Sequence, residues 1–258
     1  MTEHHPPVTV ATSVQADAWT GLRRFTAARI ALGHSGAGLP TAAHLAFQAA
    51  HAQARDAVHT PLDAAALMAD LAANGWPAFQ VASAAPDRPT YLKRPDLGRR
   101  LSDESQRRLS EPMPGCDVVL VVADGLSSAA VQANALPTLS ALVPLLRRAG
   151  RRIGPIIVAT QARVALGDPI GQILQADVAI VLIGERPGLS AADSLGLYLT
   201  WMPRIGRVDA ERNCISNVRA CGLAPTEAAR QAAALVESMV LHRAAGVALN
   251  SRLALPAP

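Results

Sequence analysis

Residues Asp177 to Ser190, with the sequence DVAIVLIGERPGLS, decide the fold. Their apolar part, Val178 to Ile183, has no polar interruption, which is typical of a strand buried on both faces of a parallel sheet. Two glycines and a proline follow within Gly184 to Gly188, so the chain must turn out of the sheet there. Turns at the carboxyl edge of an open parallel sheet are where such folds bind ligands. We therefore interpret this turn as part of a binding site, although a solvated surface turn has the same local sequence.

The composition bounds the class of protein. The chain has 258 residues, of which 50% are hydrophobic, so a large buried core is available. Aromatic residues make up only 3%, which argues against the exposed stacking platforms that bind single-stranded nucleic acid. The net charge of +4 comes from scattered arginine pairs rather than from one basic block. We expect no nucleic-acid partner.

The cysteines and the amino terminus indicate a reduced compartment. The three cysteines, Cys116, Cys214 and Cys221, form no C-x-x-C pair and predict neither a disulfide framework nor a metal site. The first residues lack the basic and apolar segments of a secretory signal. Because no apolar run approaches a membrane span in length, we expect a cytoplasmic protein that does not enter a membrane.

Helical patterns dominate the first hundred residues. Residues 1–18 are polar and rich in proline, and we expect a flexible arm. Helices are predicted over 19–32, 41–59 and 60–73, the last ended by Asn74 and Gly75. Residues 82–89 suit a linker and 91–102 a structured loop, with Ser102 as the cap of a following helix. Residues 19–100 are therefore predicted to form a helical arm.

Strands and helices alternate after residue 100. Strands are predicted at 117–123, 153–160 and 178–183, and a fourth extended segment at 194–201, whereas 209–218 look irregular. Helices are predicted from 128, over 137–150, over 169–175 and over 225–245. This order predicts an α/β fold over 101–250, a Rossmann-like, mostly parallel sheet covered by helices, preceded by the helical arm and followed by a loose tail over 251–258.

Three predicted strands end in polar or small residues, and parallel strand ends lie side by side. We expect a ligand platform there, with no G-x-S-x-G elbow, Walker loop or H-E-x-x-H motif to mark a catalytic set. No histidine stands near Cys214, so a catalytic thiolate is not expected. The platform residues are Asp124, Gly125, Leu126, Ser127, Arg163, Gly184, Arg186, Pro187 and Gly188.

Five segments, in order, carry a family resemblance. They read RFTAARIALG from Arg24, YLKRPDLGRRL from Tyr91, ADGLS from Ala123, GERPGL from Gly184 and DAERNCISN from Asp209. Together they are similar to the small (light) subunit family of ethanolamine ammonia-lyase, over about 22–246. Two departures are a short arm before the first segment and a histidine at position 34, where the family often has arginine.

The resemblance implies an adenosylcobalamin-dependent radical conversion of ethanolamine to acetaldehyde and ammonia. It places the substrate and the catalytic residues on a large subunit with a TIM-type barrel, and suggests a heterododecamer of six large and six small subunits. The helical arm would contact that large subunit. Val164, Glu185 and Cys214 would contact the cobalamin, with the Glu185 carboxylate accepting from a corrin amide N–H. Whether the enzyme is packaged in a bacterial microcompartment stays open.

The positions of the histidines indicate which group would be the lower ligand of the cobalt. None of the seven histidines has an aspartate two residues before it, so the D-x-H-x-x-G motif that replaces the lower ligand is absent. We expect base-on binding, with the cofactor's own dimethylbenzimidazole on cobalt. Two alternatives remain from the residues alone: a free-standing α/β enzyme that uses a nucleotide, and a scaffold subunit without cofactor contact.

Overall fold

The computed structural model describes residues 14–111 and 115–254. The chain divides into two compact units, 1–53 and 54–258. Residues 54–100, which the sequence analysis assigned to the helical arm, therefore belong to the same unit as the sheet. Most of the predicted flexible arm, residues 1–13, lies outside the described residues.

The first unit contains less helix than predicted. A short 3-10 helix, η1 (Thr20–Phe25), is followed by extended backbone at Thr26, and Ala31 has a positive φ of 50°. The predicted helix over 19–32 is therefore wrong beyond Phe25. None of the η1 side chains is buried, so no tertiary packing stabilises a longer helix. Helix α1 (Thr41–His59), which begins in this unit, has the predicted bounds.

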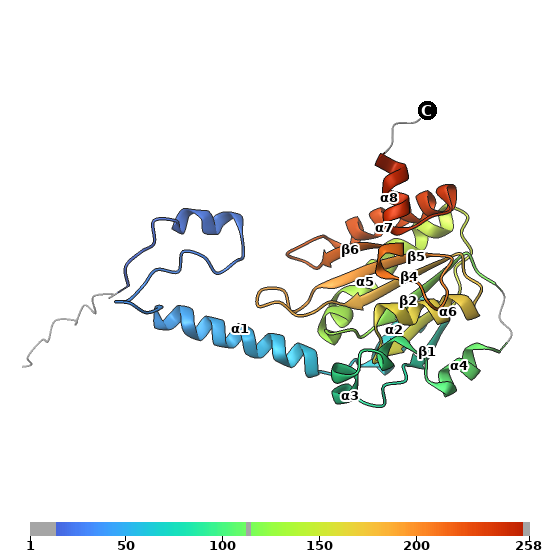
Figure 1. Ribbon diagram of the computed structural model, residues 1–258, viewed down its shortest axis with the longest axis horizontal. Helices are drawn as coiled ribbons and strands as arrows, with labels where there is room; N and C mark the ends of the chain where they lie inside the picture. The colour runs from blue at the N-terminus through green and yellow to red at the C-terminus, as the bar shows by residue number, and fades with distance from the viewer. Residues whose placement is uncertain (1–13, 112–114, 255–258) are drawn as a thin grey trace, which may run out of the picture. The chain divides into compact units, whose positions relative to one another are not determined.

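The second unit is built on one six-stranded sheet in the order β1-β3-β2-β4-β5-β6 (Figure 1). The strands are β1 (Ala78–Ala82), β2 (Val118–Ala123), β3 (Ile156–Thr160), β4 (Val178–Gly184), β5 (Leu195–Trp201) and β6 (Arg212–Val218). Strands β1, β3, β2 and β4 pair in parallel, whereas β5 is antiparallel to both β4 and β6. The α/β class is confirmed, but the sheet is mixed and the expectation of a mostly parallel sheet is wrong. The Rossmann-like description stays a prediction.

Loop length explains the antiparallel strand. Only the residues from Glu185 to Ser194 separate β4 from β5, and a parallel crossover needs a dozen residues or more. The predicted irregular segment 209–218 is instead a 3-10 turn, η4 (Asp209–Glu211), and strand β6. Its polar sequence hides a strand because β6 is the edge strand and several of its side chains are exposed.

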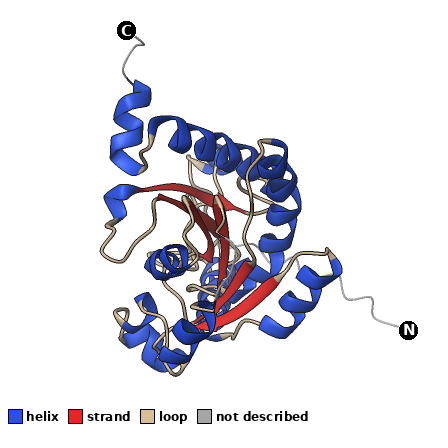
Figure 2. Cartoon of the chain, turned by 90° about the vertical axis from the view of Figure 1, so that its right-hand side faces the viewer, coloured by secondary structure: helices blue, strands red, loops and turns tan. Residues whose placement is uncertain are grey.

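Helices cover both faces of the sheet (Figure 2). On one face, α2 (Ala64–Ala73), α5 (Ser128–Arg148), α7 (Pro225–His242) and α8 (Gly246–Ala254) contribute to one apolar cluster. On the other, α4 (Asp103–Leu109) and α6 (Gly167–Ile173) contribute to a second. Alternate residues of β2 enter the two clusters: Leu120 the first and Val121 the second. The strand is therefore buried on both sides, as its apolar sequence predicts.

Helix bounds differ from the predictions at several ends. Helix α5 runs unbroken through Pro137 and Pro144, where two helices were expected. Arg243, in the left-handed region at φ 47°, separates α7 from α8, and α8 includes residues 251–254 of the predicted tail. Asp63 caps α2, so the restart at Thr60 is wrong by one turn. Ser102 caps α4 as predicted. The remaining short helices are α3 (Arg88–Lys93), η2 (Leu97–Arg99) and η3 (Val164–Leu166).

Within the described residues, α5 is the single helix whose length and composition would suit a membrane crossing. Half of its most apolar stretch is buried in this fold. Helices α7 and α8 meet the same criterion only as a pair bent by 85°. Core helices of globular proteins share this composition, and α5 contributes ten buried residues to the unit.

A buried ion pair connects strand β6 to helix α6, which covers the second face of the sheet. The Arg212 guanidinium donates to both carboxylate oxygens of Asp168 at 2.7 Å, and both side chains are 3% exposed. Arg212 also donates to Thr200 Oγ1 at 2.8 Å. The pair joins the start of α6 to the edge strand, so its loss leaves an uncompensated charge in the interior.

We expect Arg212→Ala to lower the free energy of unfolding by about 3–5 kcal/mol, because Asp168 is then buried without its partner. Urea unfolding followed by circular dichroism measures this. The control is Glu237→Ala, which breaks the more exposed Arg151–Glu237 pair and should cost under about 1 kcal/mol. Equal losses in the two variants would contradict the assignment.

Candidate functional site

The candidate site is a cavity of about 380 Å³ at the carboxyl ends of β2, β3 and β4. The turns that follow these three strands supply most of its wall, and β5 supplies Tyr198. Both tyrosines of the chain are among the lining residues, which are Tyr91, Gly125, Leu126, Arg163, Val164, Ile183, Gly184, Glu185, Arg186 and Tyr198. Apolar surface, two guanidinium groups, a carboxylate and a phenol hydroxyl thus meet in one place.

Two glycines let the turns approach each other. A Cβ at Gly125, whose φ is +56°, would stand 2.2 Å from the carbonyl oxygen of Gly184. A Cβ at Gly184 would stand 2.0 Å from the carbonyl oxygen of Ser127. The N–H of Leu126 donates to the Gly184 carbonyl at 2.9 Å. The turn after β2 therefore lies directly on the end of β4, and any side chain at either glycine would push them apart.

The Asp124 carboxylate, which is not itself in the lining, binds the backbone of the turns that form the wall of the cavity. It accepts backbone N–H bonds from Gly125 at 2.9 Å, Gln161 at 2.8 Å and Ala162 at 2.9 Å. Arg88 adds a guanidinium contact at 3.2 Å. Burial raises the pKa of Asp124, and the three N–H donors and the Arg88 charge oppose that shift. Four donors around one carboxylate favour its ionised form.

Glu185 is oriented by strands β5 and β6. Its carboxylate accepts hydrogen bonds from Ser194 Oγ at 2.6 Å, from Ser216 Oγ at 2.5 Å and from the backbone N–H of Asn217 at 3.3 Å. A carboxylate has about four lone-pair sites, so acceptor capacity remains for a ligand. Gly196 leaves room for the Glu185 side chain, because a Cβ there would stand 2.9 Å from Oε1.

Tyr198 links the cavity to Cys214, its cross-strand neighbour on β6. The phenol hydroxyl carries no charge of its own, but its proximity favours the thiolate of Cys214. The pKa of the thiol is nevertheless raised, because partial burial and the nearby charge of Glu185 outweigh that effect of Tyr198. Burial also raises the pKa of Tyr198. Both groups are therefore protonated at neutral pH, which favours a packing role for Cys214 over a thiolate.

The structure gathers most of the predicted site residues. Gly125, Leu126, Arg163, Val164, Gly184, Glu185 and Arg186 line the cavity. Asp124 lies behind it, and Ser127 caps α5 and donates to the Ala192 carbonyl at 2.6 Å. Pro187 and Gly188 lie outside the lining, in the loop that returns to β5. Cys214 is not in the lining; it is exposed and lies opposite Tyr198, on β6.

Sequence reasoning missed Tyr91, Ile183 and Tyr198 as lining residues. The sequence gives Tyr91 no role beyond the family resemblance, and Ile183 belongs to an apolar run that indicates only a buried strand. Tyr198 could be placed only with the register of β4, β5 and β6, which the sequence does not show. The scarcity of tyrosine was a usable signal, since a chain with two of them has both here.

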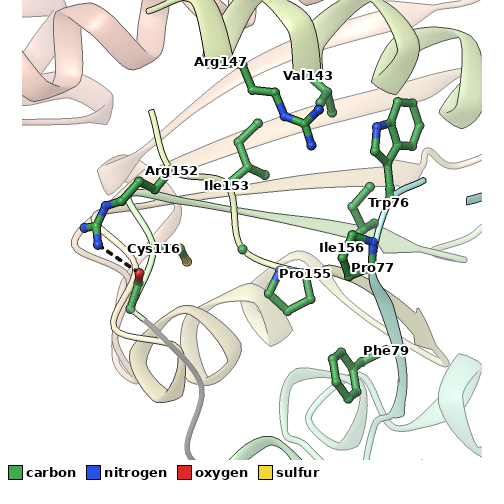
Figure 3. A pocket seen from close by; sticks show the side chains of 12 residues that line it. Trp76, Pro77, Phe79, Cys116, Val143, Arg147, Arg152, Ile153, Pro155 and Ile156 are labelled. Atoms are coloured by element: carbon green, nitrogen blue, oxygen red, sulfur yellow. Dashed lines mark hydrogen bonds between the residues drawn. The ribbon is translucent and has the colours of Figure 1, made fainter. Parts of the chain in front are cut away.

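A larger cavity of about 570 Å³ lies at the opposite, amino edge of the parallel strands. Figure 3 shows Trp76, Phe79 and Pro155 around it, with the Arg147 side chain above and Arg152 at its side. Burial raises the pKa of its one thiol, that of Cys116. The strand-end turns and their polar groups are absent from this lining, so we regard the smaller cavity as the functional candidate.

Metal ligation is not a feature of either cavity. The described residues contain no cluster of three or more His, Cys, Asp or Glu side chains that could hold an ion. The smaller cavity combines strand ends with apolar, cationic and acidic side chains, which suits an organic ligand that has both apolar and polar groups. Fold and site thus define an α/β protein with a candidate ligand site at the carboxyl ends of the parallel strands of a mixed sheet.

Comparison with known proteins identifies the family. The profile of the family described as "Ethanolamine ammonia-lyase light chain (EutC)" matches residues 16–250. The chain is 54% identical to an ethanolamine ammonia-lyase small subunit from Azotobacter vinelandii, over 90% of this chain and 87% of that one. It is 49% identical to the corresponding protein of Xanthomonas campestris pv. campestris, over 95% and 92%. The chain belongs to the ethanolamine ammonia-lyase light chain family.

We expect the rate at which iodoacetamide alkylates Cys214 to reach half of its maximum at a higher pH than for an ordinary thiol, because the pKa of Cys214 is raised. This pH is the midpoint of the reaction. Glu185→Gln should lower that midpoint, since it removes a negative charge beside the thiolate. Tyr198→Phe should raise it, since it removes the hydroxyl group that favours the thiolate. Peptide-resolved mass spectrometry against pH measures all three, and shifts of the opposite sign would contradict the geometry.

Proposed function

We propose that this chain is the small subunit of an adenosylcobalamin-dependent ethanolamine ammonia-lyase and forms part of the cofactor site. The reaction would be the conversion of ethanolamine to acetaldehyde and ammonia. The observation that carries the proposal is the meeting of Val164 and Glu185 in one cavity, with Cys214 on β6 opposite the lining residue Tyr198, in a chain of this family.

The lining fits a corrin rim, which carries neutral carboxamides and apolar edges. Glu185 offers an acceptor for an amide N–H, and Arg163 and Arg186 offer donors for amide oxygens. Val164 and Leu126 offer apolar surface. Because a cavity of about 380 Å³ is too small for a whole corrin, the chain would cover one side and a second polypeptide the other.

The residues of this chain would bind and orient the cofactor rather than react. Tyr198 and Cys214 are held protonated, and Glu185 is engaged by two serine hydroxyls, so none is set up as a general base. Adenosylcobalamin itself supplies homolytic Co–C chemistry when bound. Substrate and catalytic residues would then lie on the large subunit. The cofactor would bind base-on, because none of the seven histidines stands in a D-x-H-x-x-G motif.

The first unit offers a surface for the large subunit. Trp19 is 68% exposed and Phe25 is 73% exposed, in a chain where aromatic residues are rare. Phe47 on α1 is also exposed. Exposed aromatic residues are enriched in the centres of protein interfaces. We propose that this unit docks on the large subunit, in a cytoplasmic assembly of six large and six small subunits; packaging in a microcompartment would be a property of the host.

We expect the double variant Trp19→Ser, Phe25→Ser to abolish co-purification with the co-expressed large subunit, because it removes the aromatic contacts of the proposed interface. Size-exclusion chromatography of the tagged complex measures this. The control is Leu241→Ser on α7, which is 78% exposed and lies outside the first unit. Recovery of the full complex with the double variant would contradict the proposal.

The function is tested by mixing this chain, adenosylcobalamin, ethanolamine and the large subunit of the same host. We expect acetaldehyde only from the complete mixture. Glu185→Ala should raise the KM for the cofactor about tenfold, the effect of losing a hydrogen bond to a charged group. Glu237→Ala, a carboxylate on α7 far from the lining, is the control.

Two outcomes would favour the alternatives. Turnover of a nucleotide-dependent reaction by this chain alone would point to a free-standing enzyme. A complex that is fully active but whose cofactor KM is unchanged by Glu185→Ala would point to a scaffold subunit without cofactor contact.

A further inference from the structure

The segment that follows β1 surrounds the turn that follows β3. Arg163 and Val164, which line the cavity, belong to that turn. The backbone N–H groups of Gln161 and Ala162 donate to Asp124, and the N–H of Arg163 donates to the Gly98 carbonyl at 2.8 Å. Gln161 itself is in the left-handed region, at φ 54°. All three N–H groups are thus held by residues from outside the turn, so its shape depends on those residues.

Tyr91 is the centre of this contact. Its side chain is fully buried, and its hydroxyl donates to the Ala162 carbonyl at 2.9 Å. The guanidinium carbon of Arg163 lies 4.3 Å from the centre of the ring, and that of Arg88 lies 4.8 Å from it. Both distances are within the range of cation–π attraction, which is stronger where the cation is desolvated. One side chain therefore fixes both the backbone of the turn and the side chain of Arg163.

The segment after β1 also packs closely against the stack at Gly98. A Cβ at Gly98 would stand 2.9 Å from Arg163 Cγ and 2.9 Å from a ring carbon of Tyr91. On the other side, Arg88 also donates to the Gly125 carbonyl at 2.8 Å and to the Val58 carbonyl at 2.8 Å. The stack consequently joins the turn after β2 to the turn after β3, the two turns that flank the cavity.

We propose that Tyr91 is a positioning residue for cofactor binding, acting through Arg163 and the backbone of Ala162. This inference rests on the function proposed above and gives a role to the segment from Tyr91 to Leu101, which supplies no other residue to the cavity lining. The hydroxyl is suited to a permanent donor role, because burial raises the pKa of Tyr91 and keeps it protonated. Without the stack, the turn after β3 would open and Arg163 would leave its place in the lining.

The test uses the complex with the large subunit and three variants. Tyr91→Leu removes the ring and the hydroxyl, and Tyr91→Phe removes the hydroxyl alone. The control is Leu71→Ala on α2, another fully buried side chain, which is not in the lining. Deuterium exchange of the amides of 161–163 measures the order of the turn without any cofactor. Steady-state kinetics then separate the KM for adenosylcobalamin from kcat.

We expect Tyr91→Leu to speed exchange at 161–163 and to raise the cofactor KM about tenfold, with kcat at saturating cofactor within about twofold of wild type. Tyr91→Phe should give a smaller shift in the same direction, and Leu71→Ala should leave the cofactor KM within about twofold. These results together would support the proposal.

Three results would overturn it. A loosened turn in Tyr91→Leu with an unchanged cofactor KM would show that the turn does not position the cofactor, while leaving the proposed function intact. An equal rise in KM in Leu71→Ala would show that general loss of stability is the cause. A wild-type complex that does not bind cobalamin would remove the proposed function itself, whatever exchange shows.

Discussion

The buried carboxylate of Asp124 is the contact on which the candidate site depends. Asp124 is the first residue after β2. Its carboxylate accepts two hydrogen bonds from backbone N–H groups in the turn after β3 and one from Arg88, which follows β1. Parallel neighbours in a sheet share ladder hydrogen bonds only along their strands, so their turns need another connection. A desolvated charge satisfied by four donors provides it and resists displacement, because each lost donor leaves the charge partly uncompensated.

Two backbone approaches complete the platform. The turn after β2 rests on the end of β4 only because Gly125 and Gly184 have no Cβ. Beyond them, β5 and β6 bring Ser194 and Ser216 to the carboxylate of Glu185. The antiparallel half of the sheet is therefore part of the site: it orients the acceptor that the parallel half presents. The few aromatic residues are also unevenly distributed. Both tyrosines line the cavity, and three of the other aromatic side chains are exposed on the first unit.

Local sequence predicts the elements that are buried on both sides. The apolar runs of β2 and β4, the capped start of α4 and the length of α1 all agree with expectation, because burial and capping leave their mark within a few residues. The same reasoning does not predict which strand lies at the edge of the sheet or whether a helix continues through a proline. β6 is polar because it is an edge strand, and α5 stays whole through two prolines because its apolar face is packed between the sheet and α7.

The sequence by itself determined the α/β class, the three polar strand ends and, through five short segments, the family. Those features are local, or they are strings of residues that a comparison can read directly. Only the tertiary structure decided that Tyr198 pairs with Cys214 and that Tyr91 packs against two arginines. Each of these depends on register and on contacts between residues far apart in the chain, which are set by packing the whole unit and leave no periodic pattern in any one segment.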